Sequence, residues 1–150
     1  MDEQLKKTIF DAVKTEPCAR GLDITLVALA EGYSRVEMTY DPARMNNIYQ
    51  RAHGGAIFTL IDEAFETASQ TRGRIAVALN VNVSYLASPE NGARLTAEAR
   101  EISNSNRISN FDIAVTDENN RLIAACRATA YRTEKSVLDH LCKFVKGDAS

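Results

Sequence analysis

Residues 53–71 read HGGAIFTLIDEAFETASQT and carry the strongest structural signal in the chain. Apolar residues recur within them at spacings of three, four and seven, which predicts a helix over residues 56–71 with one continuous apolar stripe. The stripe comprises Ile57, Leu60, Ile61, Ala64, Phe65 and Ala68. Such a stripe is typical of a helix that packs along its whole length against an apolar surface.

The segments around this helix are predicted to be strands that supply the apolar surface, because their apolar and polar residues alternate between clusters of turn residues. The strands are predicted over residues 33–40, 75–87, 95–102, 111–115 and 122–132, with a loop over residues 43–55. On one face of the last strand stand small residues, namely Ala124, Cys126, Ala128 and Ala130. Small side chains let a helix lie close to a sheet. The sequence therefore predicts an α+β fold in which an antiparallel sheet wraps around one long central helix.

The whole chain, residues 1–150, is predicted to form a single domain whose core spans about residues 20–133. Its 150 residues, 45% of them hydrophobic, suffice to bury such a core. Apolar residues at helical spacing predict an N-terminal helix over residues 3–16, which Pro17 ends. A C-terminal amphipathic helix is predicted over about residues 136–146, with Ser136 as its N-cap.

Charge, hydropathy and cysteine content exclude several classes of protein. The net charge is −2 and no run of Lys or Arg could follow a phosphate backbone or an anionic membrane, so neither is an expected partner. No segment approaches the roughly 20 apolar residues that cross a bilayer, and the acidic N-terminus does not resemble a secretory signal. The three cysteines, Cys18, Cys126 and Cys142, are odd in number and far apart, which favours a reduced, cytoplasmic protein.

Common catalytic motifs are absent from the sequence, which contains no G-x-S-x-G, G-x-x-x-x-G-K-[ST], G-x-G-x-x-G or H-E-x-x-H. The two histidines are His53 and His140, and no carboxylates stand at a spacing that predicts a metal site with them, so no metal is expected. Cys126 lies on the small-residue strand face, where a buried small hydrophobe is a better interpretation than a nucleophile.

His53-Gly54-Gly55 leads directly into the predicted central helix. Glycine lets the backbone approach a ligand closely, and the first amides of a helix have no acceptor inside the helix. These amides, at the positive end of the helix dipole, suit an anion or a developing oxyanion. The alternative is a tight turn that merely needs glycine, and the motif alone favours that alternative.

Asp62 lies at the edge of the apolar stripe, four residues after Phe58 and three before Phe65. A carboxylate flanked by aromatic rings at the edge of a core is partly desolvated, which raises its pKa and its basicity. The alternative is a boundary acid that reaches water. Glu63 and Glu66 are expected further round the polar face of the helix, in solvent.

The stretch NIYQRAHGGAIFTLIDEAF, which begins at Asn47, resembles the PaaI-type hotdog thioesterases, a family of phenylacetate degradation. In that family an Asn stands six residues before the His of an HGG, and an acid stands nine residues after it. Asn47 and Asp62 have these spacings from His53, although Asn47 by itself would be interpreted as an ordinary turn residue. The resemblance continues through residues 80–86 and covers the chain from residue 31 to about residue 133.

The resemblance implies a hotdog fold and hydrolysis of an acyl-CoA, an aromatic acyl-CoA being one possibility, with coenzyme A as part of the substrate and no separate cofactor. It also implies a homodimer, often doubled into a tetramer, with the active site at the subunit interface. In such a site the Gly54 amide polarises the thioester carbonyl, and Asp62 of the partner subunit is the general base or the nucleophile. Asn47 positions the water or the carbonyl, and His53 braces the loop.

Substrate contacts are further predicted at Gly55, Phe58, Phe65, Asn80 and Asn82. The aromatic residues Phe58, Phe65 and Tyr85 line an acyl pocket or belong to the core, and the sequence leaves both interpretations open. Many relatives have an Arg just before the proline that follows the second strand of the family. Here Ala87 and Ser88 stand there, so no contact with the phosphates of CoA is predicted at these positions.

Two other functions remain open on the sequence alone. One is hydration or dehydration of an enoyl or hydroxyacyl thioester, a hotdog-fold reaction that pairs a His with an acid. The other is non-catalytic binding of acyl-CoA, which the intact set of Asn47, Gly54 and Asp62 disfavours.

Overall fold

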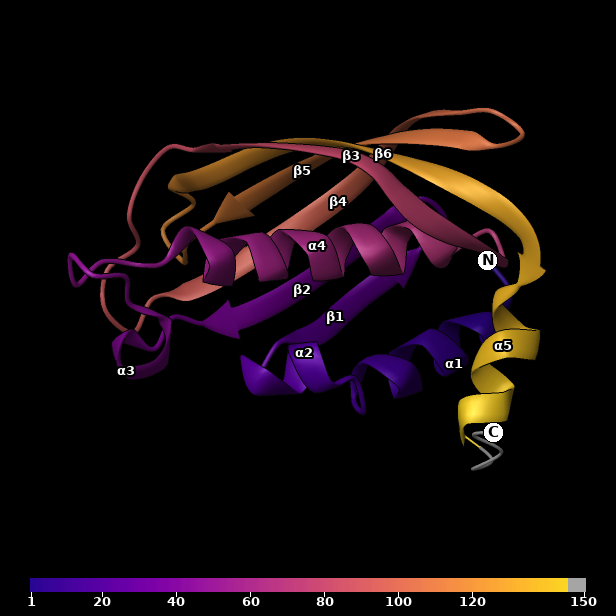
Figure 1. The fold of residues 1–150 in the computed structure, drawn as a ribbon, viewed down its shortest axis with the longest axis horizontal. Coiled ribbons are helices and arrows are strands. Elements are labelled where there is room, and N and C mark those ends of the chain that lie inside the picture. Colours follow the sequence, from indigo (N-terminus) through magenta and orange to yellow (C-terminus); the bar gives the residue numbers. More distant parts are fainter. Residues whose placement is uncertain (146–150) are drawn as a thin grey trace.

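The computed structural model of the chain describes residues 1–145, which form a six-stranded sheet and helices that pack on it (Figure 1). The helices are α1 (Glu3–Val13), α2 (Pro17–Gly21), α3 (Pro42–Met45), α4 (Gly54–Gln70) and α5 (Val137–Val145). The strands are β1 (Thr25–Ala30), β2 (Tyr33–Thr39), β3 (Arg74–Tyr85), β4 (Arg94–Asn104), β5 (Ile108–Thr116) and β6 (Leu122–Ser136). Figure 1 shows the sheet curving around α4, with α1 and α2 on the side of α4 away from β3. The predicted hotdog fold is confirmed.

The sheet has the order β1-β2-β4-β5-β6-β3, and every neighbouring pair is antiparallel. The strand that directly follows α4 therefore crosses to the far edge of the sheet, where it pairs with β6 on one side only. Pairs such as Val83 with Cys126 fix the register of β3 on β6. The backbone groups along the other side of β3 face no strand within residues 1–145.

The apolar stripe of α4 packs on the inner face of the sheet as the sequence predicts. Leu60, Ile61 and Ala64 are completely buried. The small residues of β6 face the same core and are buried as well, with Ala124 and Ala128 fully inaccessible. Because these side chains are small, a long helix fits closely against the sheet without leaving a void.

The N-terminal region differs from the single helix predicted over residues 3–16. Helix α1 ends at Val13, and a separate short helix α2 begins at Pro17. Proline fits the first helical position because its missing N–H would have no intrahelical acceptor there. Pro17 therefore starts a helix as well as following one, and the turn between the two helices holds Glu16 as the N-cap residue of α2.

Two short elements were absent from the sequence-based prediction. Strand β1 is an edge strand in which only Leu26 and Leu29 are buried, and a register shift between Leu26 and Ala28 interrupts its alternation. Helix α3 is a single turn inside the predicted loop of residues 43–55, capped by the Asp41 side chain. Neither segment has a periodicity long enough to predict it.

The predicted C-terminal helix is present as α5, and it packs against α1. The Ser136 hydroxyl accepts a hydrogen bond from the Asp139 amide at 3.2 Å, as the predicted cap requires. Residue 146, the predicted end of this helix, lies outside the described residues.

Candidate active site

His53 is the N-cap residue of α4, and its side chain holds the first turn of the helix. Its Nδ1 accepts a hydrogen bond from the Gly55 amide at 2.8 Å, while its own backbone amide donates to the Met45 carbonyl at 2.7 Å. Because Nδ1 is an acceptor, the neutral ring carries its proton on Nε2. The geometry therefore makes His53 a brace between the preceding loop and α4.

Gly54 is the first residue of α4, and its amide N–H remains available to donate to a ligand. Among the described residues no acceptor is hydrogen-bonded to the Gly54 N–H, whereas the Gly55 N–H is bound to His53. The sequence predicted two free amides here, and the structure leaves one. Helix α4 has 17 residues, so its dipole adds positive potential at this amide.

Tyr85, the last residue of β3, encloses Gly54 from the sheet side. Its hydroxyl donates to the Gly54 carbonyl at 3.1 Å. A Cβ atom placed on Gly54 would lie 3.2 Å from Cζ of the Tyr85 ring, which is tighter than ordinary van der Waals contact. A side chain at this position would therefore push against the Tyr85 ring, so glycine favours the close approach of the strand end to the helix. The alternating pattern of the strand placed Tyr85 near its end, but it did not indicate this contact.

Asp62 lies half-buried in the middle of α4. Burial raises the pKa of its carboxyl above the ordinary value, which confirms the predicted partial desolvation. Phe58, one turn earlier, is also half-buried. The other predicted neighbour, Phe65, is 2% exposed and stacks edge-on against Phe111 with ring centroids 5.4 Å apart, so its ring belongs to the core.

Asn47 organises the loop that precedes His53. Its Oδ1 accepts hydrogen bonds from the amides of Tyr49 at 2.8 Å and Arg51 at 3.2 Å. These bonds form the kind of local turn for which Asn is commonly selected. The loop carries Ile48 at its tip with 85% of its surface exposed. Within one chain, Asn47 shapes this loop through its side-chain carbonyl.

The remaining predicted contact residues are distributed over two surfaces. Gly55 is exposed at the start of α4, beside Gly54. Asn80 and Asn82 are exposed along β3, the edge strand. Cys126 is buried, and burial raises the pKa of its thiol to about 11, which supports its interpretation as a small core residue.

Glu63 is the acid whose environment the sequence predicted wrongly. It is 4% exposed, whereas Glu66 is exposed as expected. Burial, followed by the nearby charge of Glu16, raises the pKa of Glu63 to about 8. Burial and the same neighbour raise the pKa of Glu66 to about 7, although solvent at its exposed side screens part of this effect. The helical wheel identifies the side of α4 that meets the sheet. It could not predict the burial of Glu63, because Glu63 is covered on a different side of the helix.

Gly54 and Asp62 cannot act on one carbonyl group within a single chain. Asp62 follows Gly54 by eight residues on the same straight helix, which separates them by about 12 Å along its axis. A hydrogen-bond donor and a base must each approach the reacting group to about 3 Å. Both residues can therefore serve one carbonyl group only if they come from different copies of the chain, and we refer to the Gly54 and Asp62 positions as the two half-sites of such an arrangement.

Among the described residues, no helix combines the length and apolar character needed to span a membrane.

Comparison with known proteins assigns the family. The model of the thioesterase superfamily matches residues 49–124 of this chain, which include the HGG motif and Asp62. A putative esterase of Archaeoglobus fulgidus is 35% identical over 137 residues, covering 90% of this chain and 85% of the relative. The acyl-coenzyme A thioesterase PaaI of Escherichia coli is 31% identical over 119 residues, covering 79% of this chain and 84% of the relative.

Solved structures agree with these sequence matches. The E. coli PaaI structure superposes with a TM-score of 0.83 and 27% identity, covering 89% of this chain and 96% of that chain. A Streptococcus mutans protein solved with acetyl-CoA bound has a TM-score of 0.71 and 28% identity, covering 75% of this chain and 90% of that chain. With its six-stranded antiparallel sheet, its central helix and these relatives, the chain belongs to the thioesterase superfamily as a PaaI-like hotdog thioesterase.

Proposed function

We propose that the protein hydrolyses acyl-CoA thioesters in an active site shared by two copies of the chain. The observation that carries this proposal is the separation of a free helix-N-terminal amide at Gly54 from a partly desolvated carboxylate at Asp62. The relatives named for acyl-CoA hydrolysis or solved with acetyl-CoA support the substrate class. Coenzyme A enters as part of the substrate, and the reaction needs no other cofactor. The free thiols of Cys18 and Cys126 support a reducing, cytoplasmic location.

The Gly54 amide polarises the thioester carbonyl. As water or a carboxylate attacks the carbonyl carbon, negative charge develops on its oxygen, and an amide about 2.7–3.1 Å away stabilises that charge. The amide is already oriented by the helix, so it needs no reorganisation during the reaction. His53 and Tyr85 keep the first turn in place through their bonds to Gly55 and Gly54.

Asp62 of the second copy takes the proton of the attacking water. Its loss of hydration makes it a stronger base than an exposed carboxylate. The tetrahedral intermediate then collapses to the free acid, and the proton held by Asp62 goes to the departing CoA thiolate. If Asp62 is instead the nucleophile, its carboxylate attacks the carbonyl carbon, CoA leaves as the thiolate, and water then hydrolyses the acyl anhydride. In a single turnover in ¹⁸O-water, ¹⁸O in the Asp62 carboxylate with unlabelled acid requires an anhydride opened at its aspartyl carbonyl, whereas direct attack of water puts the label in the acid and leaves Asp62 unlabelled.

The open edge of β3 is the surface through which we expect two chains to pair. Large apolar residues are exposed along it, among them Val77 at 49% and Leu79 at 58%. Folded proteins seldom leave a long apolar edge strand uncovered, because it would pair with other chains. Antiparallel pairing of β3 with itself forms a two-fold interface, which is the commonest symmetry of homo-oligomers.

The contacts of α4 with β3 give the register of this pairing. Tyr85 contacts Gly54 at one end, and the Gln70 side chain bonds to the Ala76 backbone at the other. Asp62 is midway along α4, so it lies level with about residue 80 or 81 of β3. Gly54 lies level with Tyr85. A two-fold axis that brings Gly54 beside Asp62 of the second copy must therefore pass halfway between Tyr85 and residue 80 or 81, near Asn82.

A cysteine crosslink tests this register. Near a two-fold axis the same residue of both chains lies within disulfide distance, so Asn82→Cys should form a covalent dimer on mild oxidation. Asn119→Cys, which is equally exposed but lies in the turn between β5 and β6, is the matched control and should not. A monomer in solution, or efficient crosslinking at residue 119 only, would contradict the shared site.

His53 gives a reason to prefer hydrolysis over hydration. A hydratase that used this histidine as a base would need a free lone pair on the ring, but Nδ1 accepts the Gly55 amide and Nε2 carries the proton of the neutral ring. The decisive experiment measures free thiol release from a panel of aromatic and aliphatic acyl-CoAs. Thiol release with at least one of them is expected. Hydration of an enoyl-CoA without thiol release would establish the hydratase instead, and tight binding without turnover would establish a binding module.

A further inference from the structure

A groove of about 960 Å³ runs between α4 and the helices α1 and α5, outside the half-sites of Gly54 and Asp62. Much of its wall is apolar, with Ile9, Val13, Ile75 and Leu141 among the lining residues. Its ionisable lining residues are Asp11, Glu16, Glu63, Glu66 and His140. Four of these five residues are acids, so the groove has an acidic lining beside an apolar wall.

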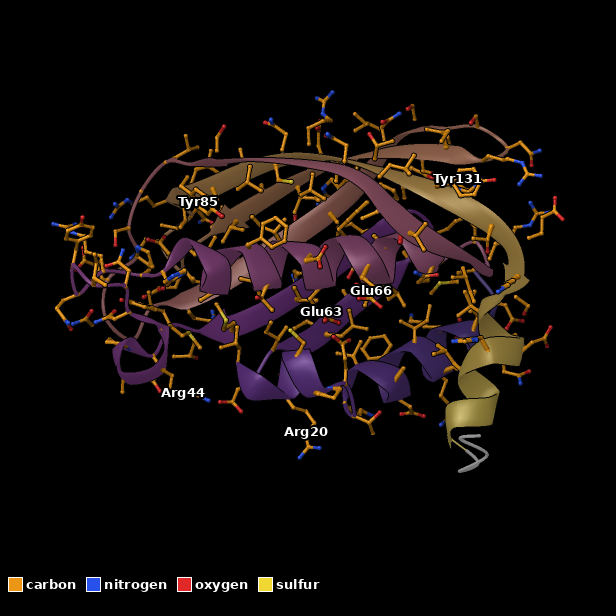
Figure 2. The ribbon with its side chains drawn as sticks, viewed as in Figure 1. Arg20, Arg44, Glu63, Glu66, Tyr85 and Tyr131 are labelled. Atoms are coloured by element: carbon orange, nitrogen blue, oxygen red, sulfur yellow. The ribbon has the colours of Figure 1, made fainter. Side chains whose placement is uncertain are left out.

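Three of these acids converge at one point. One carboxylate oxygen of each of Glu16, Glu63 and Glu66 lies within 4.8 Å of the other two. Glu63 and Glu66 stand one turn apart on α4, and Figure 2 shows both on the side of α4 that faces α1 and α2. Glu16 comes from the turn between α1 and α2, 47 residues earlier in the chain. We call these three residues the acidic cluster.

Glu63 is the member of the cluster with a buried carboxylate oxygen that lacks a hydrogen-bond partner. It is 4% exposed, and among the described residues its Oε1 has no hydrogen-bond partner. Burying a carboxylate oxygen without a donor or a counter-charge is costly, so such groups normally bind something. The neighbouring Glu16, Glu66 and Asp62 are all acids, and burial, their charges and a side-chain hydrogen bond to Glu16 raise the pKa of Glu63. An ionised Glu63 has no positive partner among these neighbours, and a cation would supply one.

We propose that the acidic cluster binds a divalent cation of the calcium type. Carboxylate oxygens are hard ligands, which suit Ca²⁺, Mg²⁺ or Mn²⁺ and do not suit soft metals. Two oxygens on one ion can be separated by at most twice the metal–oxygen distance, about 4.6–5.2 Å for Ca²⁺ and about 4.0–4.2 Å for Mg²⁺. The separations in the cluster do not exceed 4.8 Å, which is compatible with Ca²⁺ as the cluster stands, whereas Mg²⁺ requires separations of no more than about 4.2 Å.

The ion joins two parts of the chain. Glu16 belongs to the N-terminal helical region, and Glu63 and Glu66 belong to the central helix, so one ion gives the three carboxylates a common positive partner. The expected consequence is a firmer attachment of α1 and α2 to α4. This inference does not depend on the thioesterase site, since none of the three residues is assigned to it.

Thermal unfolding with and without Ca²⁺ tests the proposal. Protein stripped with a chelator and dialysed free of it should unfold about 3–10 °C higher when millimolar CaCl₂ is added at pH 8. The shift should shrink at pH 6, because protons compete for the same carboxylates. Titration calorimetry should give one site per chain, with weaker binding of Mg²⁺.

Matched Glu→Gln variants identify the site. Glu66→Gln and Glu16→Gln should weaken Ca²⁺ binding at least about tenfold, since each removes one charged ligand. Glu3→Gln, an exposed acid of α1 outside the cluster, should bind as the wild type does. Circular dichroism of each variant reports whether it has folded. Absence of a Ca²⁺-dependent shift in the wild type, or an equal shift in Glu66→Gln, would overturn the proposal.

Discussion

Asp62 and Glu63 are adjacent in the sequence, yet they belong to two different regions of the molecule. Asp62 lies half-buried on the flank of α4 that we assign to catalysis, and burial alone raises its pKa. Glu63 is turned about 100° around the helix, into the groove beside α1 and α2, where other carboxylates surround it. A raised pKa therefore does not identify a catalytic acid by itself, because the larger shift belongs to the residue outside the proposed site.

The largest expected effect separates these two flanks directly. Asp62→Asn should keep the fold and lower kcat by about 10²–10⁴, since the amide cannot accept a proton. Glu63→Gln and Glu66→Gln remove an acid from the other flank and should lower kcat far less. Steady-state thiol release by the three variants, each checked for its Tm, gives the comparison. Equal losses in all three would show that the flanks are not functionally distinct.

The oxyanion half of the site is expected to be almost as sensitive. Gly54→Val should lower turnover by about 10² or more, because its side chain collides with the Tyr85 ring and displaces the amide. Tyr85→Phe is the milder control: it keeps the ring and loses only the hydroxyl bond to the Gly54 carbonyl. Turnover by Gly54→Val near that of the wild type would remove this amide from the mechanism.

Mixing two inactive variants tests whether Gly54 of one chain and Asp62 of the other form one active site. Asp62→Ala and Gly54→Val homodimers should both be nearly inactive. When equal amounts are unfolded and refolded together, about half of the dimers are mixed, and each mixed dimer has one intact site. Activity should therefore recover to about a quarter of the wild-type value. Mass spectrometry confirms the mixed dimers, and recovery near zero in their presence would place the whole site within one chain.

The smallest expected effect is on stability and concerns Glu63. The unfolded chain ionises Glu63 near pH 4.5, whereas the folded chain keeps its proton up to about pH 8. The folded state therefore binds more protons in this window, and its stability falls as the pH rises through it. Glu63→Gln removes this dependence, so its Tm relative to wild type should increase by about 2–6 °C between pH 5 and pH 8 in chelator. An unchanged difference would mean that Glu63 is already ionised at neutral pH.

The central helix and its sheet could be predicted because their patterns are long and consistent. The 17 residues of α4 carry one helical stripe, and β6 places small residues at every second position over Ala124, Cys126, Ala128 and Ala130. Each pattern is set by contact with the core, which is the strongest constraint on a sequence. The short strand β1 has only two buried residues and a register shift, so its alternation is too weak to predict a strand.

Two local features of the candidate site follow from the residues, whereas the meeting of Gly54 and Asp62 from different subunits was implied by the family resemblance and stays a prediction. The free amide of Gly54 and the desolvation of Asp62 follow from local sequence, since the end of a helix and the edge of an apolar stripe are local properties. The burial of Glu63 depends on Glu16, which is distant in the sequence and close only after folding. Asn47 bonds within its own loop as an ordinary turn residue does, and the catalytic role that the resemblance implies for it stays a prediction.

Tyr85 joins the edge strand to the first turn of α4, and this has a thermodynamic consequence. The same residue ends the strand through which we expect two chains to associate and donates to the residue that we expect to bind the thioester. A ligand that binds only the associated form must strengthen association by the same factor by which association strengthens ligand binding. Specific activity should then fall on dilution below the dissociation constant of the pair, and saturating acyl-CoA should shift that fall to lower protein concentrations.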